Sequence, residues 1–147
     1  MTGDFLFRMI LGHLFGDYVV QSMWMALNKR KIFNAVVFHC FYYTLCVMLF
    51  LYPELLKLSV INNIIIASLV FTSHWILDGT DLLEKLLNLT KARTYVRTEE
   101  YIDSLNEYSP SYELQVDYAR SYNGFVHAVA DNTIHLFLMY MIFKFFI

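Results

Sequence analysis

Apolar residues gather in four long windows of the chain, which are separated by short polar connections and by one long polar stretch. A helix needs about 20 apolar residues to cross roughly 30 Å of hydrocarbon. The windows cover residues 5–27, 32–52, 58–79 and 125–147, and each approaches this length. The pattern therefore predicts an all-α polytopic membrane protein, a single membrane domain over residues 1–147, with four transmembrane helices in a bundle.

Two parts of this pattern are less regular than the rest. Polar residues interrupt the first window, and at membrane depth they must face protein or water; they are Asp4, Arg8, His13, Asp17 and Gln21. Residues 80–124 form a polar insert that is rich in tyrosine. In the insert we expect one helix over residues 81–89 and a second that starts at Ser109 and Pro110 and ends at Gly124.

Composition supports the membrane assignment, and charge gives an orientation. The chain is 58% hydrophobic, well above the usual share in soluble domains. Basic residues fill positions 29–31 and recur through the insert, and by the positive-inside rule both connections are cytoplasmic, with both termini outside. The first window lacks a basic start, so we expect it to be retained rather than cleaved. No basic run suggests nucleic acid.

All five histidines lie in the predicted spans, and four of them stand four residues from an aspartate. Positions four apart share one face of a helix, so each pair forms a polar stripe. The pairs are His13 with Asp17, His74 with Asp78, and His127 and His135 on either side of Asp131, while His39 stands alone. Measured by helical rise, most of these residues reach one layer in the cytoplasmic half, with Asp78 and His127 nearer the surface and His13 nearer the far side.

Imidazole and carboxylate are ligands for zinc, iron or manganese, and helical bundles build such sites from facing helices. We predict a divalent transition metal at this layer, which activates water for hydrolysis of a phosphate or another ester. The predicted ligands are His39, His74, Asp131 and His135. Asp17 and Asp78 are the predicted catalytic residues, and His13, Gln21 and His127 orient the ligands or line the entrance.

Two other functions use the same features. Histidine and aspartate chains at membrane depth also carry protons or ions, which makes a transport protein the first alternative. The second is a membrane interaction protein that meets a cytoplasmic partner through residues 94–122, with the polar pairs holding the helices in register. Gly12 and Gly16 allow close helix contact and offer a surface for a homo-oligomer.

The quoted residues resemble a family of small bacterial and phage membrane proteins, the domain of unknown function 3307. The run from His13 to Met25 is similar to its pattern H-L-x-x-D-x-x-x-Q-x-x-x-M. His39, the pair His74 and Asp78, and the run from Asp131 to His135 resemble its other motifs, with Asn132 replacing a glutamine. The resemblance covers the four windows but not residues 94–122. It implies a four-helix protein of a bacterial or phage-infected host inner membrane.

Overall fold

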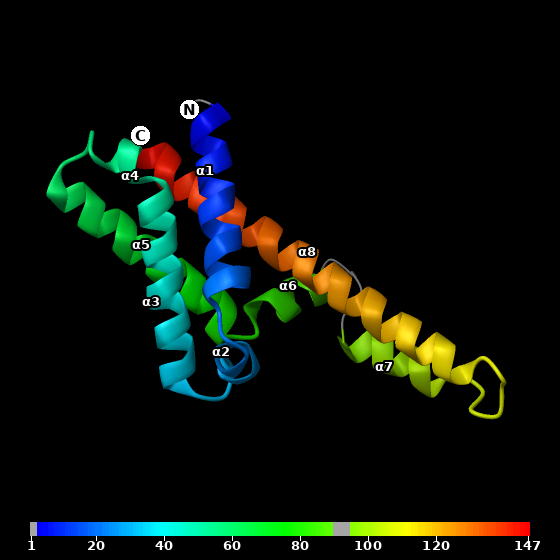
Figure 1. Cartoon of the computed structure of the whole chain (residues 1–147). Helices are drawn as coiled ribbons and strands as arrows, with labels where there is room; N and C mark the ends of the chain where they lie inside the picture. Colours follow the sequence, from blue (N-terminus) through cyan, green and yellow to red (C-terminus); the bar gives the residue numbers. More distant parts are fainter. Residues whose placement is uncertain (1–2, 90–94) are drawn as a thin grey trace. The chain divides into compact units, whose positions relative to one another are not determined.

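The computed structural model describes residues 3–89 and 95–147, and all regular secondary structure in this part of the chain is helical (Figure 1). The helices are α1 (Gly3–Leu14), the π-helical segment η1 (Phe15–Val20), α2 (Met23–Asn28), α3 (Phe33–Phe50), α4 (Tyr52–Leu55), α5 (Val60–Gly79), α6 (Leu82–Leu89), α7 (Tyr95–Asp103) and α8 (Tyr112–Phe146). The predicted all-α class is confirmed.

The chain divides into two compact units, which are described separately. Unit 1 comprises residues 1–80 and 134–147, and unit 2 comprises residues 81–133. The end of α8 therefore belongs to unit 1 and its beginning to unit 2.

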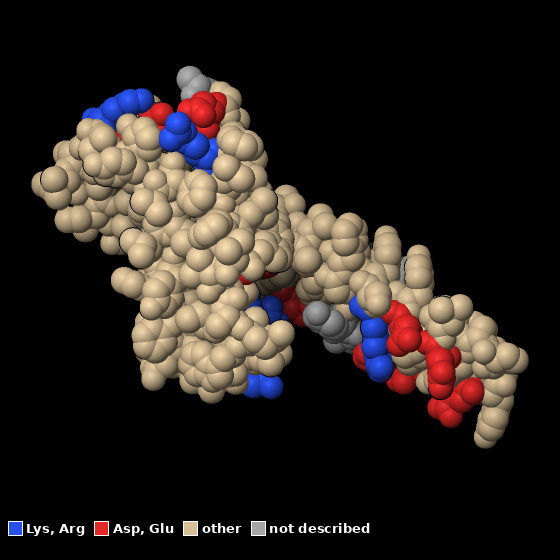
Figure 2. Space-filling view, in the orientation of Figure 1, with Lys and Arg blue, Asp and Glu red and all other residues tan. Residues whose placement is uncertain are grey.

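Within the described residues three helices, α3, α5 and α8, are long and apolar enough to cross a membrane. On α3 and α5 many large apolar side chains remain exposed, among them Phe41, Leu45, Ile61 and Ile64. In unit 1 the charged side chains lie near the two ends of the face shown in Figure 2, with uncharged surface between them. Exposed apolar helices with charges at their ends suit contact with a lipid bilayer.

The first window differs from the expected continuous helix over residues 5–27. The helix that begins at Gly3 becomes π-helical at Phe15 and ends at Val20, and Gln21 adopts an extended conformation. The Ser22 hydroxyl then accepts a hydrogen bond from the Met25 backbone N–H at 3.3 Å and begins α2. This cap satisfies a backbone donor that a continuous helix would have paired internally, so the window divides into two helical parts.

The ends of α3 and α5 follow local sequence signals. Pro53 cannot continue the hydrogen bonding of α3, and it lies instead at the start of α4. Ser59 caps α5 by accepting a hydrogen bond from the Asn62 backbone N–H at 3.2 Å. The predicted spans over residues 32–52 and 58–79 therefore match α3 and α5 to within two residues.

Inner residues of the long helices of unit 1 recur every four positions, and each series is apolar at one end and polar at the other. The series are Phe5, Met9, His13 and Asp17 on α1 and η1; Leu51, Val47, Tyr43 and His39 from the end of α3 back toward its start; Ile66, Val70, His74 and Asp78 on α5; and Phe143, Met139 and His135 on α8. The apolar members pack into one buried core. The polar ends therefore come together beside this core.

Close packing of the first helix on α3 depends on two glycines. A Cβ on Gly12 would lie 3.1 Å from the Cα of Val47, and one on Gly16 would lie 2.8 Å from Cδ2 of Tyr43. The close contact expected at these glycines is confirmed, but its partner is α3 of the same chain. The surface that we expected to serve a homo-oligomer is covered within the chain.

Unit 2 contains α6, α7 and the first part of α8. Ile102, Val116 and Ala119 form a small apolar cluster, and Arg120 on α8 pairs with Glu99 on α7 at 3.3 Å. The helix expected over residues 81–89 is present as α6. The expected end at Gly124 was wrong, because α8 continues through this residue to Phe146 without a break.

The glycine contact leads to a test of stability. We expect Gly16→Ala to destabilise the fold by about 1–3 kcal/mol, because the new Cβ overlaps the ring of Tyr43. Gly124→Ala is the matched control, since nothing lies within 4 Å of its Cβ position and alanine favours the helix interior. Thermal unfolding in detergent measures both variants, and equal stability of the two would contradict the packing role of Gly16.

Candidate metal centre

Six polar side chains from five helical segments meet beside the core of unit 1. They are His13 on α1, Asp17 on η1, His39 on α3, His74 and Asp78 on α5, and His135 on α8. The four histidines and Asp78 are buried, and the Asp17 side chain is 13% exposed. Burial of a carboxylate is costly unless charges or hydrogen bonds compensate. The contacts of each group therefore decide how this site is held together.

His74 lies at the centre of the group. Its Nε2 lies 2.8 Å from Nε2 of His39, and its Nδ1 lies 3.0 Å from Nδ1 of His135. The ring also stacks on Tyr43, with centroids 3.6 Å apart. A neutral imidazole carries one N–H and one lone pair, so His74 can donate through one nitrogen and accept through the other. Three imidazoles thus form a continuous chain across the centre of unit 1.

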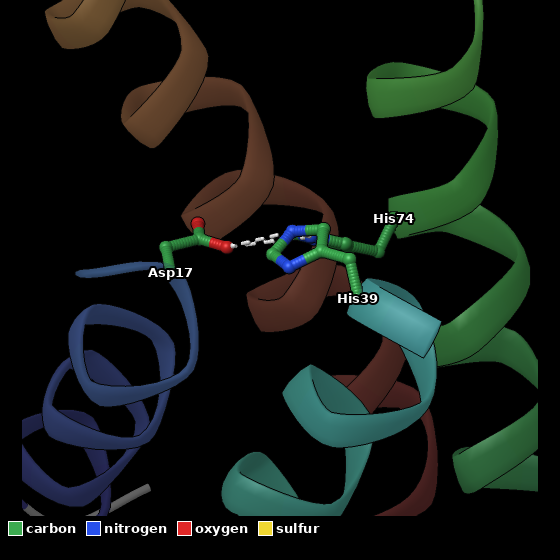
Figure 3. Close-up of side chains that lie close together, drawn as sticks. All are labelled: Asp17, His39 and His74. Carbon is green, nitrogen blue, oxygen red and sulfur yellow. Dashed lines mark hydrogen bonds and ion pairs between the residues drawn. The ribbon is translucent and has the colours of Figure 1, made fainter. Parts of the chain in front are cut away.

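Asp17 approaches two of these imidazoles from the first helix. Its Oδ1 lies 3.4 Å from Nε2 of His39 and 3.3 Å from Nε2 of His74, and Figure 3 shows the carboxylate pointing at both rings. This oxygen is buried, yet it accepts no hydrogen bond from the residues that the structure describes. A buried oxygen of this kind is energetically unfavourable unless a further group binds it.

Both carboxylate oxygens of Asp78 contact neighbouring polar groups. Its Oδ2 accepts a hydrogen bond from Nζ of Lys29 at 2.8 Å and lies 2.9 Å from Nε2 of His39 and 3.3 Å from Nε2 of His74. Its Oδ1 lies 3.4 Å from Nε2 of His135. The carboxylate therefore joins α5 to α3, to α8 and to the turn that follows α2.

These atoms form two overlapping groups that could hold a metal ion. One consists of Asp17, His39 and His74, the other of His74, Asp78 and His135, and in each group the ligand atoms lie within 4.8 Å of one another. Tetrahedral ligands at about 2.0–2.2 Å from zinc lie about 3.3–3.6 Å apart. The contacts of Asp17 Oδ1 with Nε2 of His39 and Nε2 of His74, at 3.4 and 3.3 Å, have this spacing. The donor set of imidazole nitrogen and carboxylate oxygen suits zinc, iron and manganese.

A family model covers residues 5–147 of the chain and is described as a protein of unknown function (DUF3307). The chain belongs to this family. The match includes residues 94–122, to which the resemblance seen in the sequence did not extend. No curated protein and no solved structure matches the chain.

In this DUF3307 protein, His13 lies at the edge of the cluster and contacts neighbouring side chains. Its Nδ1 lies 2.9 Å from the hydroxyl of Tyr43, which in turn donates to the sulfur of Met139 at 3.2 Å. The same nitrogen lies 3.4 Å from Oδ2 of Asp17. These contacts suit the orienting role predicted for His13, because they hold both the carboxylate and the ring that stacks on His74.

The remaining predicted site residues, Gln21, His127 and Asp131, are not among the six side chains of this cluster. The Nε2 of Gln21 is buried and has no hydrogen-bond partner among the described residues. His127 lies in unit 2, where its Nε2 is 3.1 Å from Oε2 of Glu84. Asp131 also belongs to unit 2 and is in neither group of ligand atoms. Its assignment as a ligand, and that of His127 to the entrance, stay predictions.

Sequence reasoning missed two residues of this DUF3307 site. Tyr43 follows His39 by four positions, so the spacing that identified the His and Asp pairs also places it on the inner face of α3. Lys29 was used only as a signal of orientation, although it reaches Asp78. A lysine in a loop contacts a residue 49 positions away only through the fold, and its local sequence carries no sign of this contact.

The hydroxyl of Tyr43 provides a test of this arrangement. We expect Tyr43→Phe to lower the free energy of unfolding by about 1 kcal/mol, because His13 and Met139 lose a buried hydrogen-bond partner while the stacked ring stays. Tyr42→Phe is the control, since Tyr42 is exposed on the same helix. Chemical unfolding in detergent compares the two variants. An equal effect of both would show that the buried hydroxyl contributes nothing.

Proposed function

We propose that this protein is a multi-pass membrane protein that binds a divalent transition metal at the cluster of Asp17, His39, His74, Asp78 and His135. One observation carries the proposal. Asp17 Oδ1, a buried oxygen that accepts no hydrogen bond from the described residues, meets two imidazole nitrogens from two other helices at 3.3 and 3.4 Å. A cation at this point would bind the oxygen and both nitrogens together.

The two ligand groups share His74 and differ in the aspartate that they use. An ion bound through Asp17, His39 and His74 leaves Asp78 in contact with the same two rings. An ion bound through His74, Asp78 and His135 leaves Asp17 beside His74 in the same way. Either arrangement therefore places an aspartate next to the ligands that can act as a base.

This combination suits hydrolysis of a phosphate or another ester. A transition metal lowers the pKa of a bound water to near 7 and polarises the bond to be broken. The carboxylate that does not bind the ion accepts the proton of the attacking water, which is the role that we propose for Asp17 or Asp78. Histidines that remain neutral hold the ion without adding charge.

The membrane arrangement is part of the proposal. α3, α5 and α8 supply three spans, and we propose that α1 and η1 with α2 complete a fourth, so that both termini lie outside the cytoplasm. The basic turn at residues 29–31 and the insert then face the cytoplasm of a bacterium or phage-infected host. The polar ends of the inner series lie toward this side.

Elemental analysis of the full chain tests the metal. We expect protein purified in detergent without chelators to carry zinc, iron or manganese in stoichiometric amount. His74→Ala should remove the ion, because His74 is common to both ligand groups. His135→Ala and Asp17→Asn then identify which group binds it, since each belongs to one group alone. The measurement is metal content per chain by mass spectrometry.

Asp117→Asn is the control for these variants, because Asp117 is exposed on α8 within unit 2. It should retain the metal content of the unaltered chain. Metal-free protein that gains no ion on incubation with zinc, iron or manganese would contradict the proposal, as would equal metal content in His74→Ala and Asp117→Asn.

The chain of three imidazoles favours proton conduction as a second candidate function. His39, His74 and His135 are linked at 2.8 and 3.0 Å, which is the spacing of a hydrogen-bonded relay. If the protein conducts protons, liposomes containing it should acidify under an imposed potential, and His74→Ala should abolish the flux. Tyr42→Phe should conduct like the unaltered chain. Absence of flux in metal-free protein would exclude this candidate.

A further inference from the structure

We infer that Glu84, Asn123 and His127 form a second metal site, which lies within unit 2. Glu84 is on α6, and the other two residues are on the part of α8 that belongs to the same unit. None of the three belongs to the ligand groups of the cluster in unit 1. The inference therefore stands independently of the proposed function, and it gives His127 a role other than lining the entrance to that cluster.

Two of these side chains place polar atoms in the interior without hydrogen bonds. Asn123 is fully buried, and neither its amide nitrogen nor its carbonyl oxygen has a hydrogen-bond partner among the described residues. Both carboxylate oxygens of Glu84 are also buried, and they accept no hydrogen bond from this part of the chain. Buried polar groups in this condition are unfavourable, and a bound ion is one of the few ways to satisfy them. The oxygens of both residues therefore indicate a missing cation.

The imidazole of His127 lies at ligand distance from the Glu84 carboxylate. Its Nε2 is 3.1 Å from Oε2 of Glu84, although Oε2 accepts no hydrogen bond. Ligands at about 2.0–2.2 Å from an ion lie about 3 Å apart when they meet it at right angles. The nitrogen and the oxygen are therefore spaced as two neighbouring ligands of one ion.

The positions of Asn123 and His127 on α8 suit a shared ion. They are four residues apart, so their side chains leave the same face of the helix. Two ligands with this spacing on one helix bind a single zinc ion in the helical metalloprotease motif. Glu84 contacts this face through His127. Helix α8 thus supplies two ligands, and α6 supplies the third.

The donor atoms indicate which ion the site takes. They are a carboxylate oxygen, an amide carbonyl oxygen and an imidazole nitrogen, and the imidazole favours a divalent transition metal such as zinc over magnesium or calcium. The side chains of Glu84 and His127 are 19% and 11% exposed, so water can complete the coordination shell and an ion can enter from the surface.

Isothermal titration of the full chain in detergent with zinc chloride tests the second site. The measurement uses His74→Ala protein, because His74 is common to both ligand groups of the first cluster. We expect this protein still to bind one zinc ion per chain. Glu84→Gln in the same background should weaken that binding by about 100-fold or more, since losing even a group that only orients a ligand costs about tenfold to 100-fold.

Asn123→Asp in the same background gives a second readout, which loss of folding cannot imitate. It replaces a neutral ligand oxygen by a charged one, so zinc should bind about tenfold more tightly or better. Without zinc the variant should unfold at a lower temperature, because two buried carboxylates repel each other. Added zinc should reverse this loss of stability, because it binds only the folded protein.

Glu113→Gln is the matched control, because Glu113 is exposed on α8 within the same unit. It should bind zinc as the His74→Ala protein does. If Glu84 and His127 form only an ion pair, Glu84→Gln and Glu113→Gln will bind zinc equally and Asn123→Asp will gain no affinity, and either result overturns the inference. Absence of zinc binding in His74→Ala protein overturns it as well. These results leave the first cluster untouched, since its own test is the ion lost on His74→Ala.

Discussion

The carboxylate of Asp78 is the point on which the rest of unit 1 depends. It is buried between helices, where an uncompensated charge is strongly unfavourable. Compensation comes from Lys29, His39, His74 and His135, and these residues lie on separate segments of the chain. Each helix can reach Asp78 at only one rotation about its axis and one level along it. Contacts with one buried charge therefore constrain the register of these helices.

Apolar packing is the second interaction that holds the helices of unit 1 together. From Phe5 to Asp17, and from Ile66 to Asp78, each inner series changes from apolar to polar over about three turns. Neighbouring helices run in alternating directions. Apolar residues of one helix therefore meet apolar residues of the next only if the order of apolar and polar residues along the chain is reversed, as it is on α3. An apolar core and a polar cluster then form side by side. The core excludes water from one side of the cluster, which strengthens every electrostatic contact within it.

Helical spacing and rise were enough to predict that Asp17, His39, His74 and His135 reach one layer, because helical geometry decides which residues share a face and how deep each one lies. The same reasoning placed Asp78 nearer the surface and Asp131 in the layer, whereas Asp78 lies among the histidines and Asp131 is in neither ligand group. It could not predict the partners that tertiary packing selects. Gly16 gave a sign of close contact, but Tyr43 as its partner follows only from the pairing of η1 with α3. The interruption at Gln21 and the continuation of α8 through Gly124 were also missed. Both depend on how backbone groups are satisfied locally, for which residue periodicity carries little information.

The two aspartates differ in a way that bears on their roles. Asp78 sits on a regular turn of α5, and its oxygens are engaged from several sides, so its position is determined before any ligand binds. Asp17 sits on η1, a π-helical segment, and its Oδ1 accepts no hydrogen bond from the described residues. π-Helical segments are less favourable than α-helices and occur frequently at functional sites. Asp78 is thus held by contacts from several segments, whereas Asp17 lies in a π-helical segment with an unsatisfied oxygen, and Asp17 is the aspartate that a bound cation would stabilise more.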